Sequence, residues 1–171
     1  MNAELSKAMS EQINKEYYSA FLYLAMANWC SDNGLKGASN WMYAQYQEEL
    51  AHAQGIYQYM QTRSEPVAFA AIDDPSGDWD NLLDVFKKTL AHEQFVTDSI
   101  NNLASIAMKV NDHAAYIFLQ WYVTEQVEEE GNANDWIDRL TLAADNTNAL
   151  LNIDEQLSTR VFAAPVIPHT V

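Results

Sequence analysis

The sequence predicts an all-α protein, in which four long helices form a bundle and a short fifth helix follows. Four segments repeat their apolar residues at steps of three and four, the period of an amphipathic helix. Only five glycines and four prolines interrupt the 171 residues. The connections between the segments follow the order short, long, short. That order is typical of a bundle with one long crossover between its second and third helices.

The first two helices are expected at residues 3–30 and 36–63. The first should end at Asp32-Asn33-Gly34, because a glycine just after the last turn is a common helix stop. Residues 64–77 then contain two prolines, a glycine and two adjacent aspartates, without any period. A connection of this length can cross the bundle from one end to the other.

The remaining three helices are expected at residues 78–110, 113–141 and 146–157. Asp78 is the expected N-cap of the third helix, because aspartate accepts hydrogen bonds from free helical N–H groups. Asn111-Asp112 should end the third helix and cap the fourth. We expect residues 1–158 to form one domain and residues 159–171 to form an irregular C-terminal tail.

The charge balance argues against nucleic acid as a partner. Twenty-four Asp and Glu against nine Lys and Arg give a net charge of −15, whereas phosphate backbones are bound by basic patches. A single cysteine, Cys30, excludes an intramolecular disulfide and suits a reducing compartment. Neither a signal peptide nor an apolar run of about 18 residues is visible. We therefore expect a cytoplasmic protein without a membrane partner.

Each long helix carries one glutamate near the middle of its apolar stripe: Glu16, Glu49, Glu93 and Glu129. A buried carboxylate is costly unless it is protonated or has a partner. Two ionised carboxylates about 4 Å apart repel by roughly 4 kcal/mol at an effective dielectric constant near 20. None of the nine Lys and Arg residues lies on these stripes. A multivalent cation would resolve the conflict, so the pattern predicts a metal site.

The ligand types indicate which metal is bound. Glu49 and His52 form a Glu-x-x-His motif, whose spacing puts both side chains on one face of the helix. Oxygen donors with one imidazole suit iron or manganese better than zinc. In this arrangement Glu16 completes one site, and Glu49 bridges to a second ion held by Glu93 and Glu129. Two Fe(II) ions so bridged can deliver two electrons together to dioxygen.

Simpler interpretations exist for each residue taken alone. A single glutamate on a helix is usually solvated, and residues 125–130 have the composition of a charged surface. Tyr23 at this depth is more often a packing residue than a redox partner. His92, His113 and His169 have no ligand spacing and are expected to be structural or surface residues. The coincidence of four acids and one histidine at compatible depths nevertheless favours the metal site.

Four segments together resemble bacterial non-haem ferritins: residues 13–20 (INKEYYSA), 47–52 (QEELAH), 92–94 (HEQ) and 118–126 (FLQWYVTEQ). The resemblance extends over nearly the whole chain, to about Leu157. It implies a ferritin-like four-helix bundle with a long B–C crossover and a short fifth C-terminal helix. It also implies a homo-oligomeric cage of two dozen subunits. In such a cage each subunit oxidises Fe(II) with dioxygen or peroxide, and the ferric mineral is stored inside.

The resemblance also implies roles for individual residues. Glu16, Glu49 and His52 match the first iron site; Glu49, Glu93 and Glu129 match the second, with Gln126 as a neighbour or occasional ligand; Glu48, Glu125, Glu128 and Glu129 match a third iron site; and Tyr23 matches a tyrosine that donates an electron. All of these residues belong to the four long helices.

Three departures separate the chain from related families. Residues 126–129 contain no second Glu-x-x-His motif, unlike bacterioferritins and most di-iron oxygenases. Leu50 stands where bacterioferritins have their haem-ligating methionine, so we expect no haem. Residues 114–119 lack the acids that line an entry channel in animal ferritins. Two alternatives remain: a di-iron oxidase or peroxide-scavenging enzyme that stores nothing, and a purely structural bundle.

Overall fold

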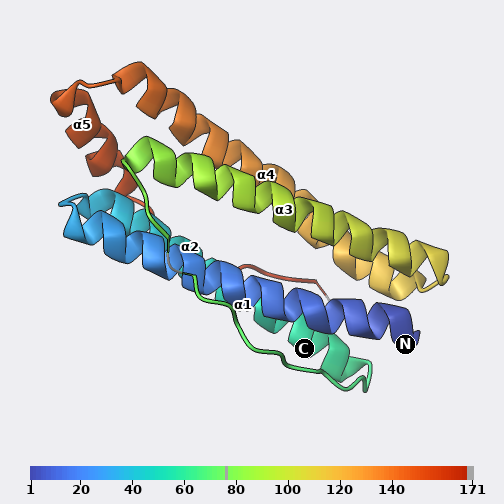
Figure 1. The fold of residues 1–171 in the computed structure, drawn as a ribbon. Coiled ribbons are helices and arrows are strands. Elements are labelled where there is room, and N and C mark those ends of the chain that lie inside the picture. The colour runs from blue at the N-terminus through green and yellow to red at the C-terminus, as the bar shows by residue number, and fades with distance from the viewer. Residues whose placement is uncertain (76, 169–171) are drawn as a thin grey trace.

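The computed structural model describes residues 1–75 and 77–168. Helices are the only regular elements in these ranges: α1 (Ala3–Asp32), α2 (Lys36–Thr62), α3 (Leu82–Lys109), α4 (His113–Ala143) and α5 (Thr147–Leu157). Figure 1 shows α1 paired with α2 and α3 paired with α4, with α5 at one end of the bundle. The predicted all-α bundle, with its long crossover and short fifth helix, is confirmed. No helix in these ranges is both long and apolar enough to cross a membrane.

The predicted stop after the first helix is present. Gly34 has a φ angle of 79°, a left-handed conformation that glycine adopts without steric cost. The N–H of Leu35 then donates to the carbonyl oxygen of Cys30 at 2.9 Å, which satisfies a free carbonyl at the helix end. This tight turn places α2 antiparallel to α1.

The predicted N-cap of the third helix is wrong. α3 begins at Leu82, and its cap is Asn81, whose side-chain oxygen accepts a hydrogen bond from the N–H of Asp84 at 2.9 Å. Asp78 remains exposed outside the helix. Trp79 lies between them and is buried in the core, so the chain enters the bundle before the helix starts. Aspartate and asparagine cap equally well, and local composition alone did not distinguish them.

The long connection between α2 and α3 lies against α1. Figure 1 shows it running along the bundle from one end to the other. The Asn14 side-chain amide donates to the carbonyl oxygen of Ala71 at 3.1 Å, and the N–H of Ala68 donates to Ser10 Oγ at 3.3 Å. These contacts hold an irregular segment on a helix surface, as expected of a crossover.

The hydrophobic core consists of two clusters, one toward each end of the bundle. The first includes Leu5, Met9, Ile13, Ile56 and Phe118; the second includes Met26, Cys30, Trp41, Phe86 and Leu157. Between them, each long helix contributes buried polar side chains to one layer: Glu16, Gln45, Glu49, His52, Glu93, Gln126 and Glu129. We call this the polar layer. It contains every acid that the sequence placed on an apolar stripe.

The fifth helix is anchored to the start of α2. The Asp154 carboxylate accepts hydrogen bonds from the N–H groups of Gly37 at 3.0 Å and Ala38 at 2.8 Å. After α5 the tail has no helix and runs back along the bundle (Figure 1), and Ile167 is buried near Gly55. Residues 169–171 of the expected tail, and the prediction for His169, lie outside the described residues.

Candidate metal centre

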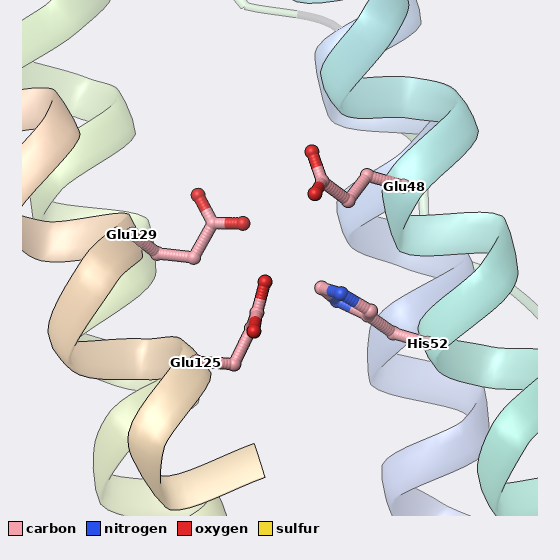
Figure 2. Close-up of side chains that lie close together, drawn as sticks. All are labelled: Glu48, His52, Glu125 and Glu129. Atoms are coloured by element: carbon pink, nitrogen blue, oxygen red, sulfur yellow. The ribbon is translucent and has the colours of Figure 1, made fainter. Parts of the chain in front are cut away.

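The polar layer, together with the half-buried Glu48 and Glu125 beside it, contains two groups of side chains that could each hold a metal ion. The first ligand group is Glu16, Glu49 and His52; the second ligand group is Glu48, His52, Glu125 and Glu129. Within each group, one ligand atom from every residue lies within 4.8 Å of all the others. Figure 2 shows the side chains of the second group pointing toward one space between α2 and α4. The structure thus brings together acids from α1, α2 and α4 around one histidine.

His52 belongs to both groups and is held by its neighbours. Its Nδ1 atom lies 3.5 Å from Glu49 Oε2, and its ring packs edge-on against Trp121, with centroids 5.5 Å apart. Within the described part of the chain, His52 Nε2 and Glu16 Oε2 are buried without a hydrogen-bond partner. Buried polar atoms are nearly always paired, so these two atoms indicate a ligand that the protein itself does not supply. Metal ions fit this donor set.

The electrostatics of the layer also favour a cation. Burial, followed by the proximity of Glu49, raises the pKa of Glu16 to about 8. Burial is likewise the main cause that raises the pKa of Glu49 and of Glu129 well above the ordinary value, and Glu93 adds to both shifts. A bound cation would favour the ionised carboxylates and reverse these shifts.

These pKa shifts predict that the metal-free protein becomes less stable as the pH rises. The folded state holds Glu16 protonated up to about pH 8, whereas the unfolded chain ionises it near the ordinary pKa of 4.5. The contribution of Glu16 to the free energy of unfolding is fully present below about pH 4.5 and is lost as the pH rises to about 8. We expect the melting temperature of the metal-free protein to fall between pH 6 and 8.

Differential scanning calorimetry at several pH values measures this effect. In Glu16→Gln the fall in melting temperature should be smaller, because one titrating carboxyl is gone. Adding divalent metal to the wild type should restore its melting temperature at pH 8. A melting temperature that is independent of pH over this range, or that rises equally in both proteins, would contradict the predicted protonation of Glu16 in the fold.

Glu93 lies beside the two ligand groups but belongs to neither of them. The Tyr23 hydroxyl donates a hydrogen bond to its Oε1 atom, and Gln126 Nε2 donates to its Oε2 atom at 3.1 Å. Burial raises the pKa of Glu93, and these two hydrogen bonds oppose the shift. Tyr23 and Gln126, which the resemblance places beside the second ion, therefore both contact Glu93.

The structure brings together three of the four acids that the resemblance assigned to a third site. Glu48, Glu125 and Glu129 meet in the second ligand group, where His52 joins them. Glu128 is exposed on α4 and lies outside both groups. Glu125 is half-buried, and burial is the first cause that raises its pKa.

Among the described residues, His92 and His113 belong to neither ligand group. His92 is largely buried; its Nε2 atom lies 2.7 Å from Ser19 Oγ, and burial lowers the pKa of its imidazole to about 4. Its ring packs edge-on against Tyr23. His113 is exposed at the start of α4.

Sequence reasoning missed two glutamines that contact the acids. Gln12 Nε2 donates to Glu16 Oε1 at 2.9 Å. Gln45 Nε2 donates to Glu129 Oε2 at 2.8 Å and to Glu49 Oε1 at 3.3 Å. The signal was present, because each glutamine precedes a buried glutamate by four residues on the same helix face. Such hydrogen bonds orient carboxylate ligands.

Comparisons with known proteins agree with this geometry. The family model described as a ferritin-like domain matches residues 6–143. The bacterial non-heme ferritin of Campylobacter jejuni is 39% identical over 92% of this chain and 94% of its own. The bacterial non-heme ferritin of Staphylococcus saprophyticus is 40% identical over 95% of this chain and 97% of its own.

Solved ferritin structures are also similar to this chain in fold and in sequence. An engineered closed form of the Archaeoglobus fulgidus ferritin superimposes with a TM-score of 0.94 at 44% identity, covering 95% of this chain and 99% of that one. The open-pore ferritin of the same archaeon gives a TM-score of 0.93 at 43% identity, covering 94% and 98%. The chain therefore belongs to the ferritin family.

Proposed function

We propose that this protein stores iron and that each subunit first oxidises Fe(II) to Fe(III) in its polar layer. The observation that carries the proposal is the convergence of buried acids on His52, with ligand atoms that have no protein partner. Glu16, Glu49 and His52 would hold one Fe(II) ion, and Glu49, Glu93 and Glu129 the other. Gln126 hydrogen-bonds to Glu93 and would orient it.

The proposed chemistry is a two-electron reduction of dioxygen. Two Fe(II) ions, one dioxygen molecule and two protons give two Fe(III) ions and hydrogen peroxide, which balances atoms and charge. Glu49 would bridge the ions, so that both electrons leave together. The Tyr23 hydroxyl donates a hydrogen bond to Glu93. Where only one Fe(II) ion is bound, Tyr23 would supply the second electron that reduces dioxygen to peroxide, and Glu93 would accept its proton. Peroxide could replace dioxygen as the oxidant.

Storage requires an enclosed space, which we propose is a cage of two dozen copies of this chain in the cytoplasm. The net charge of −15 supports this role, because acids on an inner wall would concentrate Fe(II). Family membership and the match to ferritin structures over nearly their full length support the same assembly.

The proposed storage function predicts that the purified protein is a large closed assembly and oxidises far more than two Fe(II) ions per chain. Light scattering gives the mass, and electron microscopy of iron-loaded samples shows whether mineral forms inside. A small species that stops after two ions per chain would instead identify the protein as a di-iron oxidase or peroxide-scavenging enzyme without storage.

A further inference from the structure

The tail brings one cation, Arg160, to the edge of the second ligand group. Its Nη2 atom donates to Glu48 Oε2, and its Nη1 atom donates to Gln45 Oε1 at 2.6 Å. Its guanidinium carbon lies 4.3 Å from the centre of the Trp41 ring. Sequence reasoning missed this residue, because no Lys or Arg lies on the apolar stripes and the tail has no period from which its path could be inferred.

Arg160 is held in place by its backbone as well as by its side chain. Its carbonyl oxygen accepts a hydrogen bond from the Asn40 side-chain amide at 2.8 Å, and the same amide donates to the carbonyl oxygen of Ser158 at 3.2 Å. Farther along the tail, Ile167 is buried in the first hydrophobic cluster. The side chain of Arg160 is only 21% exposed. The guanidinium is therefore part of the folded structure.

Arg160 is positioned to compete with any metal ion that binds in the second ligand group. Glu48 contributes a ligand atom to that group while one of its oxygens holds the guanidinium. Both charged side chains are mostly buried, so water screens their interaction less than at an open surface. A metal ion beside Glu48 would compete for its charge and would be repelled by the fixed cation. Arg160 has no direct contact of this kind with Glu16 or His52.

We propose that Arg160 is a specificity-determining residue that weakens metal binding at the second ligand group by competing for Glu48. The inference rests on the proposed function. Under it, Fe(II) first fills the pair of sites around Glu49, which use His52 and Glu129. The other acids of the second ligand group, Glu48 and Glu125, accept a further ion only at higher concentration. The tail thus sets the order in which iron enters the polar layer.

The test measures anaerobic binding of Fe(II) by equilibrium dialysis against the assembled protein. In the wild type we expect two tightly bound ions per chain and a weaker third. Arg160→Met should keep the first two and tighten the third by about tenfold or more, the scale of a lost charge-assisted hydrogen bond. Arg160→Lys, which keeps the charge, should stay closer to the wild type.

Arg139→Met is the matched control. Arg139 also stacks on a tryptophan, Trp136, and donates to a glutamine, Gln156 at 2.8 Å, but it contacts no acid of the centre. The Arg139→Met substitution removes the same charge and should leave the affinity for the third Fe(II) ion unchanged. In a Glu48→Gln background, Arg160→Met should have a much smaller effect on the third ion, because the competition acts through Glu48 and only the repulsion by the fixed cation remains.

The outcomes separate this inference from the proposed function. A third ion that binds equally in the wild type and Arg160→Met, or more weakly in Arg160→Met, would overturn the competition. The competition would also be overturned if Arg160→Met bound no third ion. If instead the wild type fails to bind the first two ions, or binds them independently of Glu49, the proposed function itself fails.

Discussion

Replacing Glu49 with alanine is expected to slow the initial oxidation of Fe(II) by about 100-fold or more, at least the scale of losses seen when metal ligands lose their support. Glu49 is the acid proposed to bridge both ions. It lies in the first ligand group with Glu16 and His52, and it accepts a hydrogen bond from Gln45. Without it the two ions would lose their common ligand, and the electrons could not leave as a pair. Stopped-flow absorbance after mixing with Fe(II) in air measures the rate.

Glu49→Gln separates charge from shape, because it keeps the size of the side chain and removes its ability to ionise. It should be nearly as slow as the alanine variant. Glu11→Gln is the control, since Glu11 is exposed on α1 and forms a surface ion pair with Lys7 at 3.5 Å. Wild-type oxidation rates in both Glu49 variants would exclude the polar layer as the site of oxidation.

Replacing Gly37 with alanine is expected to destabilise the fold by about 1–3 kcal/mol, the usual cost of forcing a methyl group into a packed site. A Cβ at this position would lie 1.6 Å from the carbonyl oxygen of Asp154, within bonding distance of α5. Either α5 must move or its two hydrogen bonds to the start of α2 must break. Chemical denaturation measures the loss, and hydrogen exchange in residues 147–157 should rise.

Gly131→Ala provides a matched control with the opposite sign. Gly131 lies inside α4, and a Cβ there would meet nothing within 4 Å. Alanine is about 0.8–1.0 kcal/mol more favourable than glycine in a helix interior, so this variant should be slightly more stable than the wild type. If both variants change stability in the same direction, close contact with α5 is not what requires glycine at position 37.

The fold and the acids of the centre could be predicted from periodicity. Apolar residues at steps of three and four define which face of each helix is buried, and Glu16, Glu49 and Glu129 lie on those faces. His52 follows from its spacing to Glu49 on one helix turn. A position on a helix face is a local property, so the sequence contains it.

Contacts made by irregular segments could not be predicted in this way. Arg160 reaches Glu48 only because the tail turns back along the bundle, and Asp154 reaches Gly37 only because of the turn between α4 and α5. In that turn Ala144 has a φ angle of 45°, a left-handed conformation that the presence of an alanine does not predict. The hydrogen bonds that hold Glu93 depend on its rotamer, which helix periodicity does not specify.

The polar layer also bears on where the protein opens locally. The four long helices run unbroken through it, but their apolar side chains gather in the two clusters on either side. Local opening follows regions of low apolar contact, so hydrogen exchange in the metal-free protein is expected to be faster in the polar layer than in either cluster. A cation bound there would pair the acids and should slow that exchange.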